Sequence, residues 1–301
     1  MRGKLVISGC ALLVACLTFP SHARGATAPL PTAEVEQAAI AAIPPWQGQK
    51  ATVLKYLDLT QPFDTVSPWA LVVVQDPHPQ QNFWLGQQNP IMVCLVDGRI
   101  SHCMEFQQCG VAILGELRWY MAWFTKACEP AMIFSLLDSR VVYAGAEHTR
   151  PLLLLKTASM GSMDGNKDIR TILYRYDRWV DQFRVTFTHD SAGSNNNQAA
   201  RFMEKGPLRG DVIVDFPTQH APYAYWIEVF APGKSGRYVR VLRYRGHTGY
   251  NDGNRPPVAD SEMPEILERL GLWKRGDPLP IPTDASGCMH PYLRHDEEWC
   301  E

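Results

Sequence analysis

Short apolar runs and alternating segments dominate the chain between residues 46 and 250, and they predict β-strands. The runs at residues 71–74 (LVVV) and 152–155 (LLLL) are bounded by proline and turn residues, which is typical of buried strands. Residues 183–188 (FRVTFT) alternate between apolar and polar positions, which predicts a strand with one buried face. The pattern therefore indicates an all-β, antiparallel protein with short peripheral helices.

Three stretches of this region, residues 70–106, 152–188 and 211–244, share one order of elements. Each contains an apolar strand, a polar loop and then two strands joined by a tight turn, which in the first stretch lies at Asp97-Gly98. Repeats of this kind favour an incomplete or small, propeller-like architecture. A generic antiparallel meander would give the same pattern.

Helix signals flank the β-rich region on both sides. Thr32 is positioned to cap a helix over residues 33–43, and a second short helix is expected after Ser261, with Gly271 as its stop. We therefore divide the chain into residues 1–23, 24–45, a β-rich repeat domain at 46–250 and a C-terminal extension at 251–301.

The first 23 residues have the three parts of a secretory signal peptide. Arg2 and Lys4 supply positive charge, residues 5–19 are apolar, and Pro20 precedes a small-residue cleavage site ending at Ala23. This pattern predicts export, with a periplasmic or secreted mature protein.

A second interpretation of the same segment predicts a lipid anchor. Residues 13–16 (LVAC) resemble the lipobox of bacterial lipoproteins, in which Cys16 would be lipidated and become the N-terminus. The alternative location is then the outer membrane, with the protein anchored as a lipoprotein.

Composition limits the classes of partner. The 29 Lys and Arg residues do not exceed the 31 Asp and Glu residues, and this balance argues against nucleic acid as a partner. After the signal peptide, the chain contains no uninterrupted apolar run of about 18 residues, so we expect no transmembrane span in the mature protein.

Cleavage at Ala23 leaves six of the eight cysteines. These are Cys94, Cys103, Cys109, Cys128, Cys288 and Cys300. An even number of cysteines in an exported chain predicts a fold stapled by disulfides.

Sequence separation suggests how these cysteines pair. We expect Cys288 to pair with Cys300, because closing a short loop costs little chain entropy. The other four then pair among themselves, and the Asp97-Gly98 turn favours Cys94 with Cys103, although a strict two-residue turn would place Cys94 opposite Ser101. This choice leaves Cys109 to pair with Cys128.

One polar loop places oxygen-bearing side chains at alternating positions, as calcium loops do. These side chains are Asp164, Asn166 and Asp168. The loop and the strand pattern together resemble propellers of the VCBS or FG-GAP type, and this resemblance implies a Ca²⁺ site in the loop. An EF-hand would have glycine in place of Ile169 and glutamate in place of Arg175. A polar hairpin loop without metal therefore remains the alternative.

Motifs of catalysis are missing from the sequence. Gly233-Lys234-Ser235 lacks the earlier glycine of a phosphate-binding loop and is expected to be a hairpin turn. No G-x-S-x-G motif occurs, and the consecutive His189, Asp190 and Ser191 cannot form a triad within one strand. These observations favour a protein without enzymatic activity.

The most distinctive surface candidate is an arginine- and tyrosine-rich strand. Its residues are Arg237, Tyr238, Arg240, Arg243, Tyr244 and Arg245. Regular alternation would place Arg237, Arg243 and Arg245 on one face and the other three on the opposite face. Arginine and tyrosine suit contacts with carboxylates, phosphates or proteins. A solvated sheet face is the alternative.

Together these patterns predict an exported, non-enzymatic binding protein with a protein or glycan ligand in the cell envelope. Within this class we favour an inhibitor or immunity-type partner of an enzyme that acts on the envelope. One alternative is a secreted hydrolase of glycans whose carboxylates come from separate strands. The other is a carbohydrate-binding envelope protein that stacks sugars on tryptophan.

Overall fold

The structure of the protein is a computed structural model. It describes Ala33 and residues 52–75, 80–82, 86–89, 91–97, 101–104, 107–108, 129–130, 133–145, 149–160, 167–192, 199–218, 224–249 and 258–280. Several predicted features lie outside these residues: the signal peptide, Cys16, residues 34–43, Asp164, Asn166, Cys109, Cys128, Cys288 and Cys300.

Antiparallel strands make up most of the described chain. The strands are β1 (Thr52–Asp58), β2 (Trp69–Gln75), β3 (Gln80–Asn82), β4 (Gly86–Gln88), β5 (Ile91–Asp97), β6 (Ser101–Met104), β7 (Gln107–Gln108), β8 (Glu129–Pro130), β9 (Ile133–Ala144), β10 (Arg150–Met160), β11 (Lys167–Asp177), β12 (Gln182–Ala192), β13 (Ala199–Phe202), β14 (Val212–Pro217), β15 (Ala224–Pro232) and β16 (Tyr238–Gly249). The helices among the described elements are α2 (Thr60–Phe63), α3 (Val258–Ser261) and α4 (Met263–Arg269). The prediction of an all-β, antiparallel protein is therefore confirmed.

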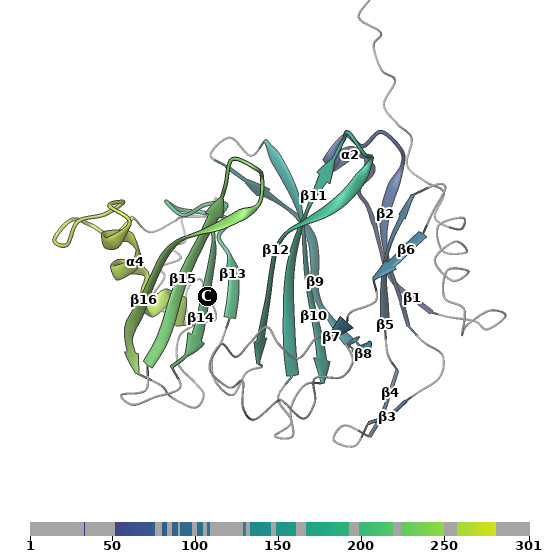
Figure 1. The fold of residues 1–301 in the computed structure, drawn as a ribbon, viewed down its shortest axis with the longest axis horizontal. Helices are drawn as coiled ribbons and strands as arrows, with labels where there is room; N and C mark the ends of the chain where they lie inside the picture. The colour runs from purple at the N-terminus through teal and green to yellow at the C-terminus, as the bar shows by residue number, and fades with distance from the viewer. Residues whose placement is uncertain are drawn as a thin grey trace, which may run out of the picture.

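An eight-stranded sheet forms the larger half of the structure. Its order is β1-β2-β5-β9-β10-β11-β12, with β6 paired to β5. The ladder between β5 and β9 consists of the single register pair Ile91–Ile133. At this weak connection the sheet turns, so that Leu71 of β2 and Leu95 of β5 pack in the same core as Leu155 of β10. Figure 1 shows β1, β2, β5 and β6 beside β9–β12.

The four leucines of β10 show why a continuous apolar run forms this strand. Leu153 and Leu155 belong to the core shared with β2 and β5. Leu152 and Leu154 point to the other face and pack against the second sheet. Both faces of β10 are buried, so no polar position interrupts the run.

A four-stranded sheet, ordered β13-β14-β15-β16, packs against β9–β12. The core between the sheets includes Phe187 of β12, whose ring lies 5.3 Å from that of Phe230 in β15. The ring of Phe187 also lies 5.8 Å from that of Tyr238 in β16. These contacts hold the two sheets face to face (Figure 1).

Helices α3 and α4 cover the outer face of the four-stranded sheet (Figure 1). Met263 and Ile266 of α4 pack with Ile227 and Tyr244 of the sheet. The predicted helix after Ser261 is present, but its N-cap is Glu262. Gly271 has a φ of 70° directly after the C-cap, which confirms its predicted role as the stop.

Propeller-like blades are not shown in the described residues. A propeller consists of separate four-stranded sheets around an axis. Here the strands of the first two repeated stretches, β2, β5 and β6 and then β10, β11 and β12, lie in one continuous sheet. The repeated pattern of elements reflects antiparallel hairpins, because each hairpin gives the same pattern whichever sheet it joins.

The predicted strand at residues 183–188 forms within β12, but its apolar side chains do not share one face. Leu173 pairs with Phe187 while Tyr174 pairs with Val185, so Thr186 is an extra residue in β12. This bulge turns Phe183 toward the first core and Phe187 toward the core between the sheets. The prediction of a single buried face was wrong for this reason.

A polar clamp joins the β11–β12 turn to the segment before β2. Asp181, with a φ of 52°, accepts hydrogen bonds from the Tyr176 hydroxyl at 2.5 Å and the Trp69 indole at 3.0 Å. It also accepts from the backbone N–H of Ser67 at 3.3 Å and from the Ser67 hydroxyl. The turn is therefore fixed to the first strands of the chain.

The β5–β6 hairpin places Cys94 directly opposite Cys103. Val96 pairs with Ser101, and this register differs from that of a two-residue turn at Asp97-Gly98. The two-residue turn that would pair Cys94 with Ser101 does not occur.

Candidate functional site

The arginines of β16 lie on one face of the four-stranded sheet because the strand contains a bulge. Phe230 pairs with Arg240 while Val229 pairs with Leu242, so Val241 is the extra residue. Beyond the bulge, Arg243 lies opposite Glu228. Arg240 therefore shares a face with Arg243, contrary to the alternation expected from the sequence.

Two of these arginines converge on one carboxylate. Oε1 of Glu228 lies 2.7 Å from Nη1 of Arg240 and 3.3 Å from Nε of Arg243. The Glu228 side chain is only 10% exposed, whereas those of Arg240 and Arg243 are 47% and 43% exposed. The carboxylate thus lies under two guanidinium groups that remain accessible to solvent.

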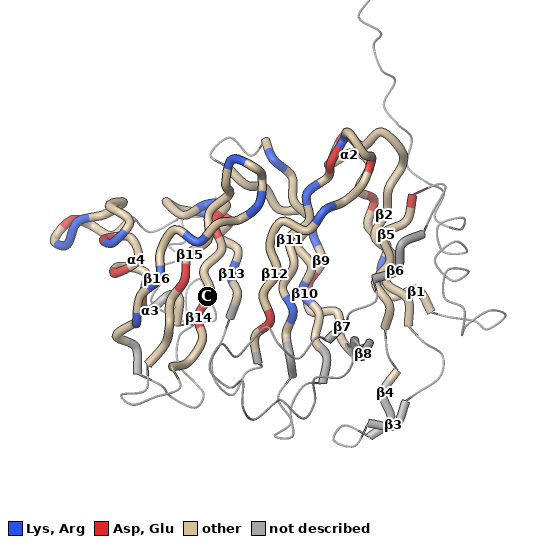
Figure 2. The backbone as a smooth tube through the Cα atoms, viewed as in Figure 1, with Lys and Arg blue, Asp and Glu red and all other residues tan. Residues whose placement is uncertain are grey.

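Trp226 supports the same cluster. The guanidinium carbon of Arg243 lies 4.6 Å from the centroid of the Trp226 ring, a cation–π contact. Arg245 pairs with Trp226 across the strands and is exposed. We call Trp226, Glu228, Arg240, Arg243 and Arg245 the arginine face. Figure 2 shows basic positions along β16 and the turn before it.

The remaining residues predicted for this surface are not part of the arginine cluster. Arg237 is exposed in the β15–β16 turn, where the N–H of Gly233 donates to its carbonyl at 2.8 Å. The expected hairpin turn at residues 233–235 is confirmed by this bond. Tyr238 faces the core between the sheets, its ring 5.8 Å from that of Phe187. Burial is the main cause that raises the pKa of Tyr238, with the nearby Asp211 as a second cause.

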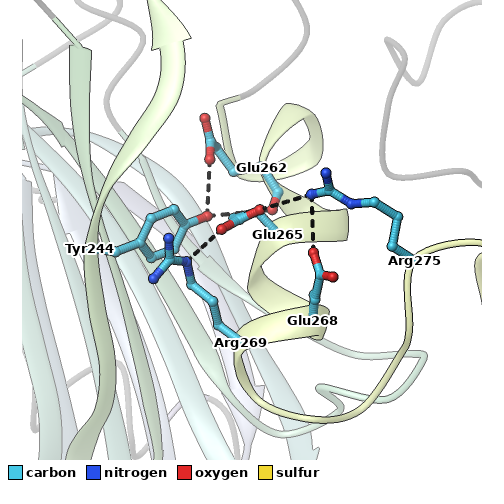
Figure 3. A network of polar contacts seen from close by, with 6 residues as sticks. All are labelled: Tyr244, Glu262, Glu265, Glu268, Arg269 and Arg275. Atoms are coloured by element: carbon cyan, nitrogen blue, oxygen red, sulfur yellow. Dashed lines mark hydrogen bonds and ion pairs between the residues drawn. The ribbon is translucent and has the colours of Figure 1, made fainter.

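Tyr244 lies on the opposite face of the sheet, under α4. Its hydroxyl donates to Oε2 of the buried Glu262 at 3.0 Å, and the guanidinium carbon of Arg269 lies 4.5 Å from its ring centroid (Figure 3). Burial, followed by the Glu262 carboxylate, raises the pKa of Tyr244. The same network contains Glu265, which binds Arg269 at 2.7 Å and Arg275 at 3.4 Å. Tyr244 therefore holds α4 on the sheet and does not belong to the arginine face.

The geometry of the arginine face suits recognition of anionic groups. A guanidinium has five N–H donors in a planar fork, and one nitrogen of each of Arg240 and Arg243 contacts Glu228. Stacking on Trp226 holds the Arg243 fork in place. A partner carboxylate or phosphate could therefore be bound by side chains that are already oriented.

The predicted calcium site lies mostly outside the described residues. Asp168 is in β11, where it pairs with Ser159 and Ala192. Within the ranges that the structure describes, no group of three His, Cys, Asp or Glu side chains is arranged to hold a metal ion.

Two residues with functional potential were missed by the sequence analysis. Burial raises the pKa of the Asp211 carboxyl to about 7. Trp179, in the β11–β12 turn, is 97% exposed. A tryptophan between Asp177 and Asp181 in a turn could have indicated exposure, because such turns carry polar residues. Nothing in the local sequence indicates the burial of Asp211.

Comparison with known proteins gives no relative. No family model, curated protein or solved structure matches this chain. Among the helices in the described part of the chain, none has the length and apolar character needed to cross a membrane.

Proposed function

We propose that this chain is an exported, non-enzymatic binding protein of the cell envelope that captures an acidic partner through the arginine face. Its location is periplasmic or secreted, or the outer membrane if Cys16 is lipidated. An inhibitor or immunity-type partner of an envelope enzyme fits this class. Carboxylates are common in enzyme active sites, and an arginine fork can block them.

The main support for this proposal is that Arg240 and Arg243 both contact Glu228 and keep their guanidinium groups partly exposed. Arginine and tryptophan are enriched among the residues that dominate binding energies in interfaces. The partly exposed arginines lie on a rigid strand and beside Trp226, so little side-chain entropy is lost when a partner binds.

Side chains, and not the strand edge, are expected to make the contact. Strand β16 ends the order of the four-stranded sheet, so one of its edges has no neighbouring strand among the described residues of that sheet. The bulge at Val241 and the charged side chains oppose the addition of another strand to this edge. We therefore expect the partner to bind the exposed guanidinium groups of Arg240 and Arg243.

Replacing both arginines is expected to abolish capture of the partner. The mature protein would be immobilised, a cell-envelope extract applied, and each retained protein identified and purified for affinity measurement. We expect the Arg240→Ala, Arg243→Ala variant to bind the purified partner about 30-fold more weakly or worse, because two interface arginines are lost. A variant with Arg178→Ala and Arg275→Ala removes the same charge from two other exposed arginines that form ion pairs, and it should bind normally.

Equal affinity of both double variants would contradict the proposed surface. Turnover of a peptidoglycan, polysaccharide or ester substrate by the purified protein would instead favour the alternative of a secreted hydrolase. Burial raises the pKa of the Asp211 carboxyl to about 7, a value suited to a general acid, so Asp211→Asn would then be the first variant to assay for turnover.

We further propose that Cys94 and Cys103 form a disulfide in the exported protein. Their direct pairing across β5 and β6 supports this bond, and Cys94 is fully buried. Peptide mapping without reduction is expected to recover one species that links the two cysteines. Recovery of Cys94 linked to any other cysteine would disprove the pairing.

A further inference from the structure

A row of four polar side chains crosses the face of the large sheet that is covered by the four-stranded sheet. Asp138 of β9 pairs with Lys156 of β10, which pairs with Thr171 of β11, which in turn pairs with His189 of β12. These four residues, which we call the polar row, come from distant parts of the sequence. Register brings them side by side on one face.

Most residues that border the polar row on the same face are apolar. Two positions along each strand toward the core lie Leu154, Leu173 and Phe187, which are buried between the sheets. Two positions in the other direction lie Ala158, Ile169 and Ser191, and the Ser191 hydroxyl donates to the Ile169 carbonyl. A polar row in such surroundings is costly unless its polar atoms are satisfied.

Two atoms of the polar row are buried without a hydrogen-bond partner among the residues described. Thr171 is 1% exposed, and its Oγ1 has no partner. Nε2 of His189, the next residue of the row, is also buried and unpartnered. Buried polar atoms are satisfied in the great majority of cases, so these two adjacent atoms are candidates to bind a polar group.

The charges around the row indicate which kind of group it could bind. Burial lowers the pKa of Lys156; the nearby Asp138 opposes this effect, while Arg140 and Arg201 add to it. Asp138 and Glu204 both form ion pairs with Arg140. Arg140 thus engages both carboxylates, and an anion beside Lys156 would compensate the charge of its ammonium. Burial also lowers the pKa of His189 to about 4, so its ring is neutral at neutral pH.

We propose that the polar row is a binding site for a small oxyanion of the phosphate or carboxylate class. The Lys156 ammonium supplies the charge, and the Thr171 hydroxyl and the His189 imidazole supply hydrogen bonds to the oxygens. An oxyanion matches all three groups, since its oxygens accept hydrogen bonds and its charge offsets that of Lys156. The site lies between the sheets and is independent of the arginine face.

Phosphate is expected to stabilise the mature protein through this site. Thermal unfolding would be followed while sodium phosphate replaces sodium chloride at constant ionic strength and pH, with acetate and sulfate as separate arms to define the class of anion. We expect a saturable rise of Tm with the preferred anion. Lys156→Met and Thr171→Val should each weaken the apparent affinity about tenfold or more, because each removes one contact.

Thr186→Val is the matched control. Thr186 is also a buried threonine of the large sheet, but its hydroxyl donates to the carbonyl of Leu173 at 3.1 Å. This variant should lose stability yet retain the anion-dependent rise of Tm. Thr171→Val has no hydrogen bond to lose in the structure, so it should fold and remain testable.

A spectroscopic measurement on the unaltered protein completes the test. In ¹⁵N spectra of histidine-labelled protein, the preferred anion should shift the His189 ring signals and leave the exposed His247 unchanged. Absence of a saturable effect with all three anions, or an equal effect in Thr171→Val, would overturn the proposal. An equal shift of His247 would also overturn it, because it would indicate a general salt effect.

Discussion

Asp181→Ala is expected to destabilise the protein more than any other single carboxylate replacement at a described turn. Four donor groups from Ser67, Trp69 and Tyr176 converge on this side chain, and they would lose a charged acceptor. Alanine also tolerates the φ of 52° poorly. We expect a loss of about 3 kcal/mol in the free energy of unfolding, measured by urea denaturation.

Arg178→Ala is the control for this effect. Arg178 forms an ion pair of 2.6 Å with Asp64, and this pair also joins the β11–β12 turn to the segment before β2. Unlike Asp181, both of its side chains are exposed. Exposed pairs of this kind contribute about 0–1 kcal/mol. Equal losses for Asp181→Ala and Arg178→Ala would show that the polar clamp is not what fixes the turn.

The contribution of Asp181 should also depend on pH. Burial tends to raise the pKa of this carboxyl, but the hydrogen bonds from Ser67, Tyr176 and Trp69 outweigh it and lower the pKa from 3.8 to about 2. The pKa of Asp181 is lower in the folded state than in the unfolded state. Its stabilising effect is therefore present above the pKa of the unfolded state and is lost as the pH falls through the pKa of the folded state. The difference in the free energy of unfolding between the unaltered protein and Asp181→Asn should therefore be constant near neutral pH. This difference should decrease as the pH falls from 4 to 2.

Tyr244→Phe is expected to loosen α4 from the four-stranded sheet. The hydroxyl of Tyr244 is a donor to the buried Glu262 carboxylate (Figure 3), and phenylalanine leaves that carboxylate without this bond. Hydrogen bonds to charged groups contribute about 1.5–3 kcal/mol. We expect a loss of this size and faster hydrogen exchange in residues 258–270.

Tyr238→Phe provides a matched comparison on the same strand. Tyr238 donates to a neutral backbone carbonyl, that of Gly210, so its loss should cost about 1 kcal/mol. Hydrogen exchange in α4 should then remain unchanged, because Tyr238 faces the core between the sheets. A larger effect for Tyr238→Phe than for Tyr244→Phe would contradict the role assigned to Glu262.

Local sequence patterns were sufficient to predict several of the strands, among them β2 and β10. The apolar runs in these two strands, the hairpin turn at residues 233–235 and the stop of α4 at Gly271 all depend on residues that are near one another in the chain. Antiparallel pairing of successive strands follows from short turns, so the all-β class could also be predicted. The sequence pattern could not decide for or against a propeller-like arrangement. Hairpins with the same pattern of strands and turns can join one sheet or several separate sheets.

Only the tertiary structure decided which side chains share a face. One extra residue in a strand reverses the faces beyond it, and the bulges at Thr186 and Val241 depend on the register of neighbouring strands. For this reason Arg240 joins Arg243 on the arginine face, while Tyr244 lies under α4. The polar row has the same origin, since it requires four strands in register, from Asp138 to His189. Alternation along one strand is encoded locally, but alignment between strands is set by packing of the whole fold.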